Sequence, residues 1–231
     1  MTSRKEFIIA SSAIAALTPR IALGATPSAS PTAKPATEKG VPKFAFDRAA
    51  FEAMVDRNVK HRHSYAATGL SDGLVLDAMT NVLDAYEASL GEKPVSATSA
   101  GVFYHGMAVC LGFNDKVWND LFIPALPKLA KLGHYDLGNP TQGQGNGWLH
   151  KGGTYDASIE RLGERGAVFF VCNNATSGFA STLAGALKRH PADVYAEMVG
   201  GLVPNALLVP AGVWAVHALQ EAHFTYQQTT L

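Results

Sequence analysis

Short apolar runs alternate with helix-like segments along most of the chain, and this alternation constrains the fold more than any other feature. Residues 97–104, 167–171, 207–209 and 224–227 are expected to be strands. Apolar side chains recur at helical spacing in residues 46–55, 75–90, 114–122, 159–165, 176–188 and 213–222, and a further helix is expected to open at Pro191. Alternation of helices with apolar strands predicts an α/β fold with a mostly parallel sheet and helices on both faces.

The start of the chain has a different composition from the rest. A charged opening that includes Arg4 and Lys5 precedes a short apolar run, and small residues near Gly24 suit cleavage. This order predicts an export signal peptide over residues 1–24. Residues 25–42 are rich in Pro, Ala, Ser and Thr and predict a linker, since they lack large apolar side chains. The folded domain is therefore expected over residues 43–231.

The opening is similar to the twin-arginine export motif, with Lys5 in place of the second arginine. Such a signal predicts a periplasmic protein that is exported already folded, and general secretion of the unfolded chain is the alternative. The resemblance permits an oligomer or a cofactor that is assembled before export.

Charge and cysteine content exclude several classes of protein. The chain has 19 Lys and Arg against 19 Asp and Glu, so it lacks the basic surface of a nucleic-acid binder. Two cysteines are too few for a disulfide-rich scaffold or a four-cysteine zinc site. The sequence has no apolar run of the roughly 18 residues that a spanning helix needs. We therefore expect no nucleic-acid partner and no membrane span.

Three of the expected strands end in residues that suit a binding site. Ligands of parallel sheets bind beyond the carboxyl ends of the strands, so neighbouring strands would bring these residues to one crevice. We predict catalytic roles for Cys172 and His105, because the N-terminus of the next helix and a nearby imidazole both favour a thiolate. The predicted substrate-binding residues are Gly106, Asn173, Asn174, Pro210 and Gly212.

Three segments carry a resemblance to a known family. The runs GVFYHGMAV and AVFFVCNNA and the closing segment LVPAGVWAVHALQEAHFTY resemble the DsrE/DsrF-like superfamily, also called YchN-like. The segment from His61 to Glu87 resembles the helical stretch of its longer, exported branch, so the first strand is expected only at residue 97. The resemblance implies a three-layer α/β sandwich that assembles as a trimer or hexamer. It also implies sulfur relay, with a persulfide on Cys172 and a small sulfur compound or a sulfur-carrier protein as partner.

Three alternatives stay open at this point. In the first, Cys172 has only a structural role, and the protein is a non-catalytic module that binds a small ligand or a partner. A disulfide between Cys110 and Cys172 would indicate redox chemistry. A metal or haem site would use His105, Cys172 and a third ligand such as His63 or His217, although no metal-binding motif supports it. The His61-Arg62-His63 run is expected to place its two imidazoles on different faces, so we predict no bound metal and no cofactor.

Overall fold

The computed structural model describes residues 41, 43–93, 96–129, 145–151 and 157–229, which belong to a unit spanning Lys39–Leu231. The expected signal peptide and almost all of the expected linker lie outside the described residues.

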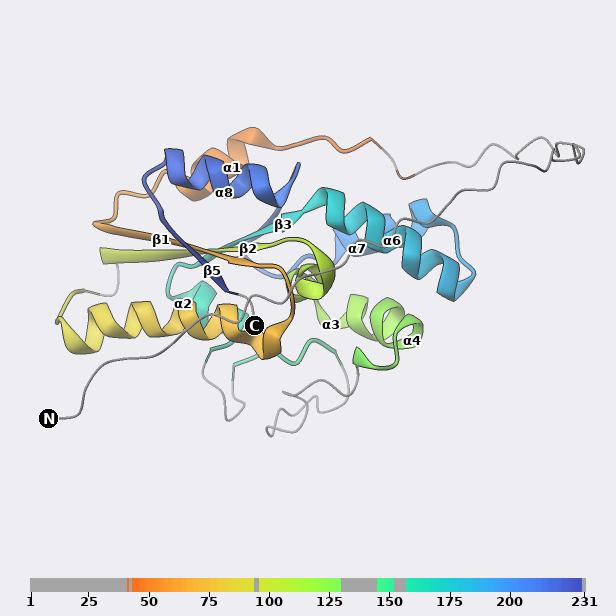
Figure 1. Ribbon diagram of the computed structural model, residues 1–231, viewed down its shortest axis with the longest axis horizontal. Helices are drawn as coiled ribbons and strands as arrows, with labels where there is room; N and C mark the ends of the chain where they lie inside the picture. The colour runs from red at the N-terminus through yellow and green to blue at the C-terminus, as the bar shows by residue number, and fades with distance from the viewer. Residues whose placement is uncertain (1–40, 42, 94–95, 130–144, 152–156, 230–231) are drawn as a thin grey trace, which may run out of the picture. The chain divides into compact units, whose positions relative to one another are not determined.

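The unit is built on one five-stranded parallel sheet with helices on both faces, as the sequence predicts (Figure 1). The strands lie side by side in the order β4-β3-β2-β1-β5. All carboxyl ends therefore meet at one edge of the sheet, and all amino ends at the other. The strands are β1 (His61–Ala67), β2 (Ala97–Phe103), β3 (Val168–Cys172), β4 (Ala206–Val209) and β5 (Thr225–Thr229).

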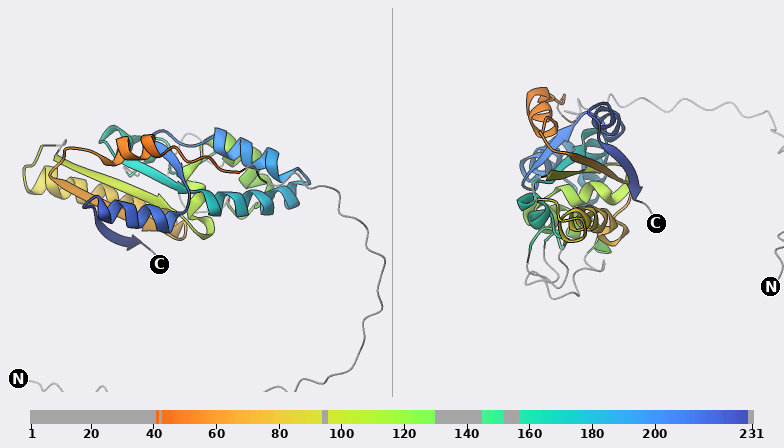
Figure 2. Two further views of the ribbon diagram at one scale, coloured as in Figure 1. Left: turned by 90° about the horizontal axis from the view of Figure 1, so that it is seen from above. Right: turned by 90° about the vertical axis from the view of Figure 1, so that its left-hand side faces the viewer.

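Helices form a layer on each side of the sheet. The views from above and from one end show α1 and α8 on one face and α2 on the other, while α6 and α7 extend from the carboxyl edge (Figures 1 and 2). The longer helices are α1 (Arg48–Val55), α2 (Leu74–Asp84), α5 (Ile159–Glu164), α6 (Asn173–Leu187), α7 (Pro191–Gly200) and α8 (Gly212–Glu221). The shorter helical segments are η1 (Ser71–Gly73), η2 (Ala85–Ser89), η4 (Gly106–Gly112), α3 (Asp115–Val117), η5 (Trp118–Phe122) and α4 (Ile123–Ala125).

The apolar side chains of the strands alternate between two cores. Phe169 and Val171 of β3 belong to the larger core, which α2, η4, η5, α6 and α7 complete. Val168 and Phe170 of the same strand belong to the smaller core beneath α1 and α8. This division explains why residues 167–171 are apolar without interruption, since both faces of β3 are covered.

β1 is the one strand that the sequence analysis missed. The segment after His61 was expected to be helical, but His61–Ala67 is a strand between β2 and β5. Its residues are small or polar, and Ser64 is nevertheless buried at 1% exposure. The neighbouring strands and α2 supply the apolar cover, so the position of the strand in the sheet outweighs its weak apolar pattern.

Local sequence accounts for several helix boundaries. Asp47 caps α1, and its carboxylate accepts a hydrogen bond from the Ala50 backbone N–H at 2.9 Å. Gly91 follows the α2–η2 stretch at a φ of 66°, a conformation that favours glycine. The helix expected at residue 176 instead begins at Asn173, directly after β3. This early start matters for the site, because it makes Cys172 the N-cap of α6.

Candidate functional site

A crevice of about 340 Å³ opens at the carboxyl edge of the sheet, where β2, β3 and β4 end. It joins three segments that are far apart in the sequence, as expected from neighbouring parallel strands. His105 and Cys172 both line it, so the structure brings the two predicted catalytic residues together. The lining residues are Tyr104, His105, Cys172, Asn174, Ala175, Ala211, Gly212 and Val213.

Cys172 sits at the N-terminus of α6. It is the N-cap residue, and its Sγ accepts a hydrogen bond from the Ala175 backbone N–H at 3.4 Å. Its side chain is 5% exposed, so only a small part of it faces the crevice. The unpaired N–H groups and the positive end of a helix favour negative charge, so this position suits a thiolate.

His105 follows β2 in a strained backbone conformation. Its φ is 66° and its ψ is 150°, a region that is almost restricted to glycine. The residue is exposed, and its side chain makes no hydrogen bond or ion pair within the described part of the chain. Strain of this kind persists only where the surrounding structure holds it in place, and such residues concentrate at functional sites.

The structure does not bring every predicted substrate-binding residue into the crevice. Asn173 points away from it, since its Oδ1 accepts a hydrogen bond from the Tyr195 hydroxyl at 2.6 Å. Gly106 begins η4, and Pro210, which precedes α8, does not line the cavity. Asn174 does line it. Neighbouring residues of a helix point in different directions, which separates Asn173 from Asn174 once α6 begins at Asn173.

Gly212 lines the crevice for a reason that the sequence did not reveal. A Cβ atom at Gly212 would lie 2.1 Å from Cβ of Tyr104. Close approach at Gly212 therefore serves the packing of α8 against the end of β2 and does not leave space for a ligand. Tyr104 also neighbours Tyr226 of β5, and burial, followed by the nearby Tyr104 hydroxyl, raises the pKa of Tyr226.

Tyr104 is the aromatic lining residue that sequence reasoning missed. It stands directly before His105 at the end of a strand, and its position beside a predicted catalytic residue was the only available signal. Its side chain forms one wall of the crevice and covers the start of α8.

The second cysteine lies in a different environment. Cys110 is in η4, wholly buried in the larger core, and both cysteines are free thiols. Burial raises the pKa of the Cys110 thiol far above its usual range, because a thiolate loses its hydration there. The structure gives no support to the disulfide alternative.

A metal site that includes Cys172 is not supported either. Neither His63 nor His217 lines the crevice. Among the described residues, no group of three or more His, Cys, Asp or Glu side chains is arranged to hold a metal ion.

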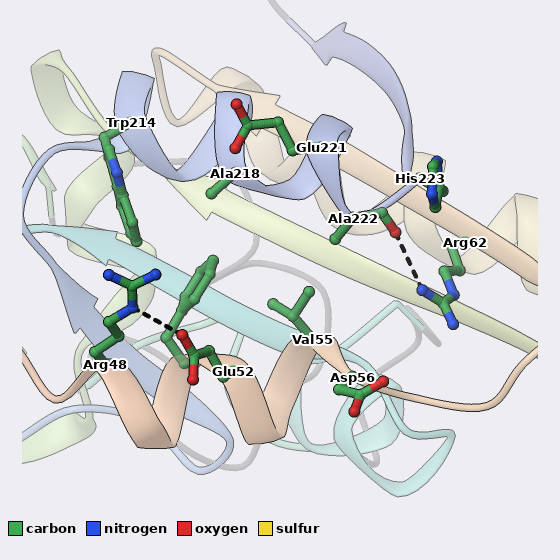
Figure 3. A pocket seen from close by; sticks show the side chains of 11 residues that line it. Arg48, Glu52, Val55, Asp56, Arg62, Trp214, Ala218, Glu221, Ala222 and His223 are labelled. Carbon is green, nitrogen blue, oxygen red and sulfur yellow. Dashed lines mark hydrogen bonds and ion pairs between the residues drawn. The ribbon is translucent and has the colours of Figure 1, made fainter.

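A larger cavity of about 640 Å³ lies between α1 and α8 (Figure 3). Phe51 and Trp214 form an apolar part of its lining, while charged groups stand around it. Arg48 pairs with Glu52 at 2.7 Å, and Arg62 donates to the Ala222 carbonyl at 3.1 Å. Both arginines in the cavity lining thus already form an ion pair or a hydrogen bond within the protein. None of the predicted site residues lines this cavity.

A second polar cluster, which we call the His150 cluster, consists of Asp115, Asn146, His150 and Glu160. His150 lies between two carboxylates, with Nε2 2.5 Å from Asp115 Oδ2 and Nδ1 3.0 Å from Glu160 Oε1. Burial opposes the imidazolium, but the hydrogen bonds and charges of Asp115 and Glu160 outweigh it and raise the pKa of His150. Asn146 is completely buried and bonds the backbone at Leu111, Phe113 and Trp148.

Comparisons with known proteins add little to this geometry. No protein-family model matches the chain, and no curated protein matches it. A solved structure of a protein of unknown function from Methanobacterium thermoautotrophicum is similar, with 15% identity and a TM-score of 0.39. The match covers 73% of this chain and 99% of that protein. None of the helices in the described part of the chain has the length and apolar character that crossing a membrane requires.

Proposed function

We propose that the protein binds and relays sulfane sulfur, which Cys172 carries as a persulfide. The observation that carries the proposal is the position of Cys172 Sγ at the N-terminus of α6, in one crevice with His105. The resemblance to the DsrE/DsrF-like superfamily and the expected trimer or hexamer belong to this proposal. So does a periplasmic location, which rests on residues 1–24.

The proposed step is an exchange of one sulfur atom. The Cys172 thiolate attacks the terminal sulfur of a small persulfide, R–S–SH, and a bond forms between Sγ and that sulfur. The bond to the R–S sulfur breaks, and R–S⁻ leaves with the electron pair of that bond. Transfer to the thiolate of an acceptor reverses these roles, so the cycle needs no oxidant or reductant.

His105 has a supporting role in this proposal. Its imidazole takes the thiol proton before attack and returns a proton to the departing R–S⁻. The residue is exposed, and its side chain makes no hydrogen bond to a carboxylate within the described residues. The crevice volume of about 340 Å³ suits a small sulfur compound.

The exposed rim of the crevice leaves room for a larger sulfur donor or acceptor. Val213 is 57% exposed and lines the crevice. A sulfur-carrier protein is the partner that this rim would accept, with its own thiol placed at Cys172.

Intact-mass measurement after exposure to polysulfide tests the proposal. We expect the full chain to gain the mass of one sulfur atom, which reductant removes, and alkylation before exposure to prevent the gain. Cys172→Ser is expected to abolish the gain, while Cys110→Ala, a matched change at the other thiol, is expected to keep it. Equal sulfur uptake by Cys172→Ser would contradict the proposal.

A non-catalytic binding module is the second candidate, and the 5% exposure of Cys172 is the observation that favours it. In that case Cys172 only caps α6, and its thiol is alkylated no faster than free cysteine. Ligand binding in the crevice would then be unchanged in Cys172→Ser, because serine is also a good N-cap residue.

A further inference from the structure

The amino edge of the sheet carries a pair of histidines that the proposed function does not use. His61 and His63 are two residues apart on β1, so their side chains share one face of the sheet. The expectation that the two imidazoles face different ways is therefore wrong. Both rings lie against Tyr86 of η2, with centroid distances of 4.0 and 5.4 Å.

Both histidines present a nitrogen that has no hydrogen-bond partner. The Nε2 atoms of His61 and His63 are buried from solvent and accept or donate no hydrogen bond among the described residues. A buried polar atom without a partner costs free energy, so such atoms are rare in folded proteins. Two of them side by side on one strand point to a group that is bound between them.

Contacts of Thr225 favour one tautomer of His63. The Thr225 hydroxyl donates its single hydrogen to the Arg62 carbonyl at 3.2 Å. Its oxygen, 2.9 Å from His63 Nδ1, then accepts the Nδ1–H hydrogen bond. Neutral His63 consequently presents a lone pair at Nε2.

We propose that His61 and His63 bind a divalent transition-metal ion of the zinc and copper class through their Nε2 atoms. Neutral imidazole is a preferred ligand of these ions. Metal-binding histidines characteristically donate their other ring N–H to a fixed oxygen, which is the role of Thr225 here. The side chain of His61 is 23% exposed, so one ring of the pair borders solvent.

Glu92 is a neighbouring carboxylate of the histidine pair. Its Oε1 lies 3.8 Å from His61 Nε2 and 2.5 Å from Lys60 Nζ. The described residues thus supply two imidazole ligands and a nearby carboxylate that is paired with Lys60. Water completes the coordination of the ion. The site lies at the opposite edge of the sheet from Cys172, so the metal-site proposal does not depend on the sulfur-relay proposal.

Metal binding by the untagged full chain tests this inference. We expect equilibrium dialysis to give one Zn²⁺ per chain, and Cu²⁺ at the same site to show an electron paramagnetic resonance spectrum with coupling to imidazole nitrogens. His61→Gln and His63→Gln should each weaken Zn²⁺ binding by about 10- to 100-fold or more. His217→Gln and Cys172→Ser are the matched controls, and both should bind like the natural chain.

Two changes outside the imidazoles sharpen the test. Thr225→Val should weaken binding about tenfold, because His63 loses the partner of its Nδ1–H, and Thr225→Ser should restore it. Lys60→Gln should strengthen binding, because it frees Glu92 and removes a positive charge. Unchanged Zn²⁺ binding in a folded His63→Gln protein, or the absence of nitrogen coupling with Cu²⁺, would overturn the proposal.

Discussion

The crevice at Cys172 and the His150 cluster are both polar, but their hydrogen bonds differ. In the cluster, both nitrogens of His150 and both carboxylate oxygens of Asp115 and of Glu160 have partners. In the crevice, the His105 side chain has no partner among the described residues, and Cys172 Sγ accepts one long hydrogen bond.

This difference separates a polar group that holds the fold from one that is available for chemistry. Groups bonded on every side contribute to stability and have no capacity left for a substrate. Groups that face a cavity without such partners, sometimes in a strained backbone conformation, can form hydrogen bonds with a ligand. Changes in the His150 cluster should therefore alter stability and leave sulfur uptake intact, while changes in the crevice should alter sulfur uptake.

Asn146→Ala should have the largest effect on stability. The change removes the side-chain partner of three backbone groups, at Leu111, Phe113 and Trp148. We expect a loss of about 3 kcal/mol in the free energy of unfolding, measured by urea denaturation. Sulfur uptake per folded molecule should not change. A loss below about 1 kcal/mol would show that the cluster does not anchor residues 145–151.

Gly212→Ala should damage the crevice through packing. The new Cβ would meet Cβ of Tyr104, which cannot move aside like the end of a flexible side chain, so α8 or the end of β2 must shift. We expect a loss of about 1–3 kcal/mol in the free energy of unfolding together with slower sulfur uptake.

Gly185→Ala is the matched control for Gly212→Ala. A Cβ at Gly185 of α6 meets nothing within 4 Å, and alanine favours a helix. The same chemical change should thus raise stability by up to about 1 kcal/mol at Gly185. Equal effects at the two glycines would show that Tyr104 does not constrain the crevice.

The sequence predicted the fold class and the main features of the crevice, because both follow from strand ends. A continuous apolar run marks β3, and parallel strands bring their carboxyl ends together, which is enough to place Cys172 near His105. β1 was missed because its pattern is polar and its burial depends on its neighbours. The role of Asn173 was missed because it depends on where α6 begins, which is decided by the cap at Cys172.

His105→Gly should separate the effect of backbone strain on stability from the effect of the imidazole on sulfur uptake. Glycine adopts the φ of 66° without a Cβ penalty, so we expect the free energy of unfolding to rise by about 1 kcal/mol. Loss of the imidazole should slow sulfur uptake. His105→Ala is the control, since it removes the imidazole but keeps the Cβ, and it should be equally slow but less stable than the glycine variant. Equal stability of the two variants would contradict the assignment of strain.

The smallest effect concerns the pH dependence of the His150 cluster. The pKa of His150 is raised in the folded protein, so the imidazolium is bound more tightly there than in the unfolded chain. Its contribution to stability is complete below about pH 6.5, the value for an unfolded histidine, and is lost as pH rises through the raised pKa. Because the His150 side chain is 31% exposed, solvent screens the interaction, and we expect less than about 1 kcal/mol.

The His150 prediction is measured as a difference between the natural chain and His150→Gln. Urea denaturation at several pH values from about 5 to 9 should show the two stabilities converging as pH rises. The difference removes the contribution of His63, whose lowered pKa acts in the opposite direction. Sulfur uptake should be the same in both proteins at each pH, because the His150 cluster and the crevice share no lining residue. A pH-dependent change of uptake in His150→Gln would therefore break the separation between the two regions, even if the stability curves behave as expected.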